Sequence, residues 1–500
     1  MNEAQRYALA QPVYADPAGK HATHMYGPLA TPLIGTMFRI TGPSFLPARI
    51  MSLVSLTLLI LLVLAIAAPR RARLTATIAL TLMVLSAHAV ADGVEPRPDC
   101  SSLLLATLAL VVMYHASQRA SWLLWFSAAL LTTFAMLLKQ PTVMVAAVPL
   151  LQTVTAGRLG HPLTHWLQRS VPLVTAFLTI ALTAVCFPNA FHFSFRVPGQ
   201  YAIEWKYVSQ WSVILLIFLL VLLPAWQALR QTPATDRTML HPDVRGTWFL
   251  STLLVSVPCC LITASKTGGM MNSLLPAIFS GIALFLHWSQ PLEQLLRENG
   301  RLQWHSRSLR ATRVVLAVLL MAPVVILIPN RPTSVTFGDA GFAAQCERVR
   351  LFAGNVGCPQ DPALLVLAGR TPQQSLVLEY DAAGWPSSDP MRLVDGWNTW
   401  DAFVSVGRRN DWRMWPWTVE DLEEHLQQHG FELSESADFP DSRYRFWIRR
   451  HSPVRSTLNS KPLETQQRVQ QQDGSTSPGI ARCDWTTQPR SQARAGHIAR

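Results

Sequence analysis

Residues 50–68 read IMSLVSLTLLILLVLAIAA, a stretch without a single charge, and this stretch decides the fold class. A helix of about 20 mainly apolar residues is long enough to cross the hydrocarbon core of a bilayer. Similar runs follow at 74–92, 101–116, 121–138, 141–157, 171–188, 211–229, 248–265, 273–288 and 311–329. The sequence therefore predicts a mainly α-helical, polytopic membrane protein with about ten transmembrane helices.

The composition of the whole chain agrees with a membrane protein. Half of its 500 residues are hydrophobic and only 14% are charged, whereas about 25% of the residues in soluble domains are charged. This balance excludes a purely soluble enzyme, a fibre and a disordered scaffold. The net charge of +12 does not indicate nucleic-acid binding, because the arginines lie mainly in short loops beside apolar runs and in the C-terminal tail.

The basic residues also predict the orientation of the spans. The loops on one side, at 69–73, 115–121, 157–170, 230–247 and 289–311, carry most of the arginines. By the positive-inside rule this side is cytoplasmic. We therefore expect an even number of spans, with the N-terminus and the C-terminal segment on the extracytoplasmic side of the plasma (inner) membrane.

We expect four regions along the chain. Residues 1–49 form an outer loop with an interfacial helix within 26–47, and residues 50–329 form the transmembrane domain. Residues 330–450 form a small extracytoplasmic α/β domain, and residues 451–500, rich in Gln, Ser, Arg and Thr, form a disordered tail.

The predicted α/β domain combines short strands with one helix. The apolar runs Ala363–Ala368, Gln374–Tyr380 and Tyr444–Arg449 read as strands, and a helix begins after Thr418 and ends at Gly430. A pair of cysteines, Cys346 and Cys358, is able to close a disulfide in an oxidising compartment. Seven tryptophans either stack on a glycan or fill a small core: Trp385, Trp397, Trp400, Trp412, Trp415, Trp417 and Trp447.

Polar residues that are hard to explain structurally gather on the predicted outer face. Asp99 precedes an apolar run, where it either caps a helix or serves a site. Lys139 and Gln140 separate two apolar runs with almost no loop, so the lysine either snorkels or holds a lipid phosphate. Lys266 opens a Gly-containing loop that either turns tightly or binds an anion through backbone N–H groups. That loop includes Gly268, Gly269 and Asn272.

Two further outer segments carry polar and aromatic residues. The N-terminal segment holds Glu3, Asp16, Lys20, His21 and His24, and the two histidines are a weak metal signal without a helical context. The loop 188–210 holds several aromatic residues that fit either an interfacial belt or a sugar-stacking surface. We favour the belt for most of them.

Several of these motifs, in this order, resemble the GT-C class of membrane glycosyltransferases, and most closely its protein-mannosyltransferase-like branch with the Rgt-type sugar transferases. The motifs are Tyr26-Gly27-Pro28-Leu29, Gly42-Pro43-Ser44 with Arg49, Arg97-Pro98-Asp99, Lys139-Gln140, and Gly268-Gly269 with Asn272-Ser273-Leu274-Leu275-Pro276. The resemblance covers about residues 1–330. It implies transfer of a sugar from a polyprenyl-phosphate donor to a glycan, lipid or protein acceptor on the outer face.

The resemblance also implies roles for individual residues. Family members carry an acidic residue or pair in the first outer loop, after a first spanning helix. Here Asn2-Glu3 takes that place, so we expect either that the helix lies upstream of Met1 or that this copy has lost part of the family's site. Glu3 would be the base that accepts the acceptor's proton, with Asp99 assisting it or holding a divalent cation, Mg²⁺ or Mn²⁺. The residues expected to hold the donor phosphate are Arg97, Lys139, Gln140 and Lys266. Asp16, Gly268, Gly269 and Asn272 would line the substrate loop.

Two other classes of function stay open from the sequence. A transporter or flippase for a lipid-linked saccharide would place charges near the bilayer midplane, whereas the predicted spans are almost free of charge. A catalytically inactive scaffold would keep the fold and use the C-terminal domain to bind a partner. The position of the polar residues favours surface chemistry over translocation.

Overall fold

In a computed structural model of the chain, the described residues are 2–14, 27–67, 98–156, 160, 162–219, 244–266, 271–298, 340–371, 399–406, 419–434 and 444–452. The apolar runs at 74–92 and 311–329 and almost all of the predicted tail lie outside these residues. So do the predicted strand at 374–380, the second half of the run at 211–229, and Thr418.

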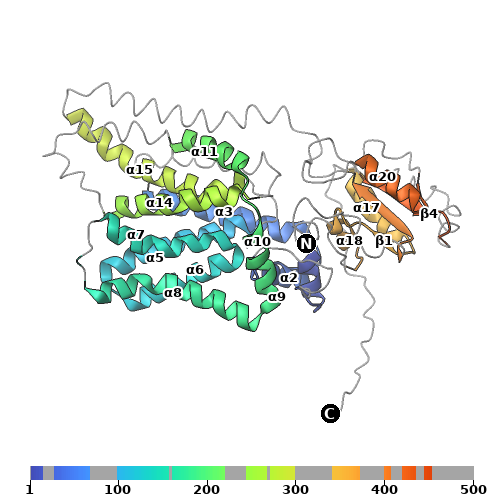
Figure 1. Cartoon of the computed structure of the whole chain (residues 1–500), viewed down its shortest axis with the longest axis horizontal. Coiled ribbons are helices and arrows are strands. Elements are labelled where there is room, and N and C mark those ends of the chain that lie inside the picture. The colour runs from blue at the N-terminus through green and yellow to red at the C-terminus, as the bar shows by residue number, and fades with distance from the viewer. Residues whose placement is uncertain are drawn as a thin grey trace, which may run out of the picture.

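The body of the protein is a bundle of long helices. Its main elements are α3 (Phe45–Ala67), α5 (Asp99–Arg119), α6 (Trp122–Leu138), α8 (Leu163–Cys186), α11 (Trp205–Leu219), α14 (Val244–Ala264) and α15 (Leu275–Glu298). Figure 1 shows these helices running roughly parallel or antiparallel, side by side. Among the described residues, α3, α5, α8 and α14 each contain a segment long and apolar enough to cross a membrane, while α6 is shorter and equally apolar.

Small side chains let these helices approach one another closely. Ala106, Ala109, Ala116, Ala128 and Ala135 are all buried where α5 packs against α6 and their neighbours. Alanine and other small residues are typical of helix contacts within membranes, because close backbone approach strengthens van der Waals packing. The large apolar residues face outward instead, as expected for a surface in contact with lipid; examples are Leu123, Phe177 and Val185.

The predicted span at 141–157 has an unexpected form. It consists of a 3₁₀-helix, η2 (Gln140–Ala147), followed by a short α-helix, α7 (Val148–Thr155). Each begins with a proline in its first turn, at Pro141 and Pro149. Proline removes a backbone donor and is tolerated best at a helix start, so one apolar run is divided into two helices.

Two short helices, α1 (Asn2–Ala8) and α2 (Ala30–Thr41), precede the bundle, and α2 lies within the predicted interfacial helix. They pack through Ala4, Ile34 and Phe38. Gly35 permits this contact, because a Cβ atom there would lie 2.7 Å from the carbonyl oxygen of Ala4. Arg39 fixes the end of α1 by donating from Nη2 to the carbonyl of Tyr7 at 2.9 Å.

The described part of the C-terminal region contains both helices and strands. The helices are α17 (Ala340–Leu351), α18 (Pro362–Leu367) and α20 (Val419–Gln428), and the strands are β1 (Val356–Gly357), β2 (Ala402–Val406), β3 (Phe431–Leu433) and β4 (Tyr444–Arg449). The sheet has the order β1-β2-β4-β3; β1 pairs with β2 in parallel, and the other pairs are antiparallel.

The expected elements of this region meet different outcomes. The helix ending before Gly430 and the strand at 444–449 are confirmed, and Gly430 has the positive φ of 77° that suits a glycine. The strand expected at 363–368 is wrong, because the segment forms α18, which begins with Pro362 after Asp361. A short, uniformly apolar run cannot distinguish a buried strand from a buried helical turn by its periodicity.

Aromatic residues fill the core of the C-terminal region. Trp447 is fully buried and donates from Nε1 to Ser405 Oγ at 2.9 Å. Trp400 packs its ring onto Gly357, where a side chain would not fit. These two tryptophans therefore support the core interpretation, while the other five lie outside the described residues. Cys346 and Cys358 are both thiols in this structure, so the disulfide that an oxidising compartment would allow is not formed in it.

Candidate functional site

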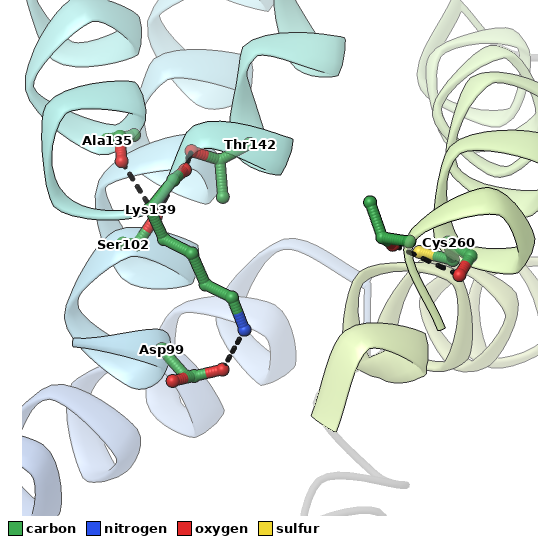
Figure 2. A network of polar contacts seen from close by, with 7 residues as sticks. Asp99, Ser102, Ala135, Lys139, Thr142 and Cys260 are labelled. Atoms are coloured by element: carbon green, nitrogen blue, oxygen red, sulfur yellow. Dashed lines mark hydrogen bonds and ion pairs between the residues drawn. The ribbon is translucent and has the colours of Figure 1, made fainter. Parts of the chain in front are cut away.

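An ion pair between Asp99 and Lys139 lies at one end of the helix bundle, which we call the Asp99 end. Asp99 is the first residue of α5, and Lys139 follows the last residue of α6, so an antiparallel pair of helices brings them together. Lys139 Nζ donates directly to Asp99 Oδ1 (Figure 2). Asp99 is only 5% exposed. A buried carboxylate of this kind needs such a partner, because removing a charge from water is costly.

A second layer of hydrogen bonds holds the backbone of Lys139. Its N–H donates to the carbonyl of Ala135 at 2.9 Å, and its own carbonyl accepts from Thr142 Oγ1 at 2.7 Å. Ser102, one turn into α5, donates to Ala135 at 2.8 Å and lies 3.1 Å from Thr142 Oγ1. Figure 2 shows this network on one side and Cys260 of α14 facing it. The lysine is thus fixed at its backbone as well as at its ammonium group.

The first predicted outer loop contacts the same turn. The N–H of Leu29 donates to the carbonyl of Leu137 at 2.9 Å. Gly27 lies so near that a Cβ atom there would meet the backbone of Leu137 and Leu138. The Gly27-Pro28-Leu29 part of the motif therefore packs against the two residues before Lys139, and the absence of a side chain at Gly27 makes this contact possible.

A third segment connects to the pair through Gln140. This segment, 188–200, consists of α9 (Pro188–Phe191), the π-helix η3 (His192–Arg196) and α10 (Val197–Gln200). Gln140 Nε2 donates to the carbonyl of Ser194 at 2.6 Å, and Ser194 Oγ lies 3.5 Å from the hydroxyl of Tyr14. A single turn of π-helix is rare and is often found at functional sites. Here it directs Ser194 between two segments that are far apart in the sequence.

Lys266 joins the same segment from the opposite side. Its Nζ donates to the carbonyl of Pro198 at 2.7 Å. The backbone beside it forms a bridge with Ile203, and the carbonyl of Ser265 accepts from the N–H of Glu204 at 2.9 Å. Partial burial lowers the pKa of Lys266, because the charged form loses hydration. An ammonium in this setting gains from an anionic ligand.

Glu3 lies on α1 and is 8% exposed. The pKa of Tyr14 is raised to about 12, mainly by burial of the phenol. The hydrogen bond with Ser194 lowers this pKa, and the nearby negative charge of Glu3 raises it. Tyr14 therefore stays protonated at neutral pH. Because α1 is packed on α2, Glu3 is carried on a fixed helix near the segment that Gln140 contacts.

The structure pairs Asp99 directly with Lys139, and it connects Gln140 and Lys266 to the segment 188–200. Glu3 is linked to that segment through Tyr14. Arg97, Asp16, Gly268 and Gly269, together with His21 and His24, lie outside the described residues. Asn272 belongs to the short 3₁₀-helix η5 (Met271–Leu274), which leads directly into α15. The sequence analysis did not identify Tyr14 and Ser194, because neither belongs to a motif and their contact depends on the π-helix.

The expected divalent cation can be compared with this geometry. In the part of the chain that the structure describes, no three His, Cys, Asp or Glu side chains gather in a manner suited to a metal. Asp99 Oδ1 is engaged by the ammonium of Lys139, which competes with a cation for the same oxygen. The described residues therefore fit a phosphate-binding ammonium better than a metal centre, and the cation stays a prediction.

Two comparisons with known proteins give results. Residues 23–192 match the family described as dolichyl-phosphate-mannose-protein mannosyltransferase. The fold matches the crystal structure of ArnT from Cupriavidus metallidurans bound to undecaprenyl phosphate, with a TM-score of 0.53 and 14% identity over 90% of this chain and 92% of that chain. The resemblance to GT-C membrane glycosyltransferases is confirmed. No curated protein matches the sequence.

The family match covers part of the candidate site, and Glu3, Tyr14 and Lys266 lie outside it. Residues 23–192 contain α2, the Asp99–Lys139 pair, Gln140 and the start of the π-helix. At 14% identity the likeness to ArnT shows a shared fold, that of a multi-pass membrane protein. The match to the family includes the motifs at residues 26–29, 42–49, 97–99 and 139–140, and it does not reach the motif at 268–276.

Proposed function

We propose that this protein is a membrane glycosyltransferase that moves a sugar from a polyprenyl-phosphate donor to an acceptor at the extracytoplasmic face of the plasma (inner) membrane. One observation carries the proposal. Separate segments that bear Glu3, Tyr14, Gln140 and Lys266 converge at the Asp99 end, within and beside the region matched by the mannosyltransferase family. The ArnT structure was determined with undecaprenyl phosphate bound, which supports a lipid-linked donor.

The proposed reaction breaks the bond between the sugar's anomeric carbon and the phosphate oxygen. A hydroxyl of the acceptor attacks that carbon from the opposite face, so its configuration inverts. The hydroxyl's proton passes to a carboxylate, and the bonding pair stays with the phosphate, which leaves as polyprenyl phosphate. The protein needs two things for this step: a base at the acceptor and positive charge at the leaving phosphate.

Lys139 is our choice for the positive charge. Asp99 holds its ammonium at the Asp99 end, and the hydrogen bonds around its backbone keep the side chain in one place. A donor group that is fixed before the reaction stabilises the transition state without having to reorganise. Asp99 acts as a positioning residue for Lys139 in this proposal, rather than as a second base.

Lys266 and Glu3 complete the proposed site. Lys266 is partly desolvated and lies on the other side of the segment that Gln140 contacts, so it is suited to a second oxygen of the phosphate. Glu3 is the described carboxylate that lies near Tyr14 and this segment, and it is the proposed base. Tyr14, as a neutral phenol beside Glu3, is suited to hold the acceptor's hydroxyl group.

The proposal is tested by sugar transfer in membranes that contain the full chain. Radiolabelled polyprenyl-phosphate mannose and polyprenyl-phosphate glucose are supplied as donors, and the release of polyprenyl phosphate is measured. We expect Glu3→Gln to lower turnover by about 10²-fold or more, as for loss of a general base. Lys139→Met should lower it by about 10²- to 10³-fold, as for loss of an electrostatic stabiliser of the transition state.

Matched substitutions on exposed surfaces serve as controls. Glu347→Gln on α17 and Lys206→Met on α11 make the same chemical changes away from the Asp99–Lys139 pair. Both should turn over like the parent protein. If Glu3→Gln and Asp99→Asn both leave transfer intact, the assignment of the site is wrong. If no variant and no parent protein releases polyprenyl phosphate while a labelled lipid-linked sugar crosses the membrane, the protein is a flippase instead.

A further inference from the structure

A cavity of about 250 Å³ lies inside the bundle, and it extends from Thr142 beside the Lys139 network to Arg245 at the far end of α5. Its walls come from α3, α5, η2, α14 and α15, and include Leu103, Ala106 and Leu110 on α5 and Phe279 on α15. From Leu103 to Tyr114 it follows α5 for eleven residues, or about 16 Å at 1.5 Å per residue. That length is close to the half-thickness of a bilayer's hydrocarbon core, about 15 Å.

The walls of the cavity are apolar in effect, although several hydroxyl groups belong to them. Thr107 donates to the carbonyl of Leu103 at 2.8 Å, Thr252 to that of Trp248 at 2.8 Å, and Ser280 to that of Pro276 at 2.6 Å. Each hydroxyl is thus satisfied within its own helix and presents little polarity to the cavity. Apolar cavities of this kind do not hold ordered water and accept hydrocarbon.

The polar end of the cavity is opposite to the Asp99 end. Arg245, an exposed residue in the first turn of α14, lines this end together with Tyr114 and His115 from the last turns of α5. Arg245 Nε lies 3.3 Å from the hydroxyl of Tyr114, and its guanidinium stacks over that ring. Among the described lining residues, Arg245 carries the one permanent charge. The cavity therefore has an apolar shaft and a cationic mouth.

Trp248 gives an independent indication of a ligand near this mouth. It lies one turn into α14 from Arg245, lines the cavity and is 4% exposed. In the described part of the protein, no acceptor lies within hydrogen-bond distance of its buried indole N–H. Buried tryptophan N–H groups usually find an acceptor. An ester carbonyl just below a lipid headgroup would supply one at this depth.

We propose that the cavity binds one acyl chain of an anionic phospholipid, with the lipid phosphate at Arg245 and an ester carbonyl at Trp248. The length fits a chain from one leaflet, and the charge fits a headgroup at the Arg245 end. Arg245 and Arg119, at this end of α14 and α5, belong to loops that the positive-inside rule predicts to be cytoplasmic. The proposed headgroup position at Arg245 therefore lies at the opposite end of the cavity from Lys139, and the proposal does not depend on sugar transfer.

The experiment is native mass spectrometry of the delipidated full chain in detergent. Phosphatidylglycerol and phosphatidylcholine with identical acyl chains are titrated as probes. We expect phosphatidylglycerol to bind more tightly, and Arg245→Gln to weaken it about fivefold, as expected for one basic residue at an anionic membrane surface. Arg119→Gln, an exposed arginine at the last turn of α5 outside the cavity, is the matched control and should bind as the parent does.

A second variant tests the shaft rather than the mouth. Ala106→Leu adds bulk to the cavity wall and should weaken both phospholipids, provided that its thermal unfolding matches that of the parent. Arg245→Gln is an exposed change and keeps the test decisive if Ala106→Leu fails to fold. The proposal is overturned if the two phospholipids bind equally and Arg245→Gln has no effect. It is also overturned if Lys139→Met, rather than Arg245→Gln, weakens the binding of phosphatidylglycerol, because the lipid phosphate would then lie at Lys139 in the proposed donor site.

Discussion

Replacing Gly27 with alanine should loosen the contact that holds the first outer loop against Lys139. A Cβ atom at Gly27 would lie 2.9 Å from the carbonyl carbon of Leu138 and closer still to the carbonyl oxygen of Leu137, whereas ordinary Cβ contacts begin at 3.4 Å. Both obstacles are backbone atoms of a buried helix end, so they cannot rotate away. The loop must instead move outward by more than half an ångström.

The cost has two parts. Overpacking of a close contact costs about 1–3 kcal/mol. Moving the loop also stretches the hydrogen bond from the N–H of Leu29 to Leu137, which contributes about 1 kcal/mol. The free energy of unfolding should therefore fall by about 2–4 kcal/mol, which lowers the apparent Tm by roughly 4–8 °C at about 2 °C per kcal/mol. Sugar transfer should fall as well, because Lys139 directly follows the displaced turn.

Gly199→Ala is the matched control for this prediction. A Cβ atom at Gly199 meets nothing within 4 Å, so the same chemical change should leave the apparent Tm unchanged or raise it slightly. Thermal unfolding of both variants in the same detergent makes the comparison. If Gly27→Ala unfolds at the same temperature as Gly199→Ala, the loop does not pack against α6 as described, and its role in holding Lys139 must be abandoned.

Three further predictions concern the N-terminal helix, a buried arginine and pH. Gly35→Ala should separate α1 from α2, because its Cβ atom would lie 2.7 Å from the carbonyl oxygen of Ala4. Sugar transfer should fall more than in the control Gly160→Ala, whose Cβ atom meets nothing within 4 Å. Equal turnover of the two variants would show that transfer does not require α1 to pack on α2. Arg169→Met should lower the free energy of unfolding by about 2–3 kcal/mol, because it leaves buried acceptors unsatisfied. The neighbouring control Ser170→Ala should leave thermal unfolding unchanged. Similar thermal unfolding of the two variants would contradict the hydrogen bonds from Arg169 to α7. Burial lowers the pKa of Lys266, so its ammonium loses its proton at a lower pH than that of an ordinary lysine. The affinity for the donor should therefore fall as the pH rises through this lowered pKa. If Lys266→Arg loses affinity at the same alkaline pH as the parent protein, Lys266 does not bind the donor phosphate.

The spans in the described residues could be predicted because hydrophobic length is a direct physical requirement of the bilayer. The beginning of α8 could not. It begins at Leu163 rather than 171 and includes Arg169, which reads as a loop residue by the positive-inside rule. Arg169 is instead buried and donates to Thr153 Oγ1 at 2.7 Å and to Gln152 Oε1. Its partners come from α7, and no local pattern reveals that a neighbouring helix will satisfy a charge.

The site shows the same division between what a pattern reveals and what it does not. Asp99, Lys139 and Lys266 were candidates because charges beside apolar runs need a reason, and all of them lie at one end of the bundle. The partnership of Tyr14 with Ser194 was not predictable, because it depends on a π-helix turn and on the placement of an N-terminal segment. Local sequence indicates which residues are costly to place, and only tertiary structure indicates which residues offset that cost.

The Asp99–Lys139 pair changes the chemistry that the sequence suggested. Taken separately, Asp99 was a second base or a metal ligand, and Lys139 was a phosphate anchor. A helical hairpin in which α5 begins with one residue and α6 ends just before the other must place them side by side. The ammonium of the partly buried Lys139 then compensates the charge of the buried Asp99 carboxylate. An oxygen that already accepts from an ammonium is less available to a metal cation. In the proposed mechanism Glu3 takes the proton and Asp99 orients Lys139, so Asp99→Asn should weaken donor binding more than it alters the acidic limb of the pH profile for turnover.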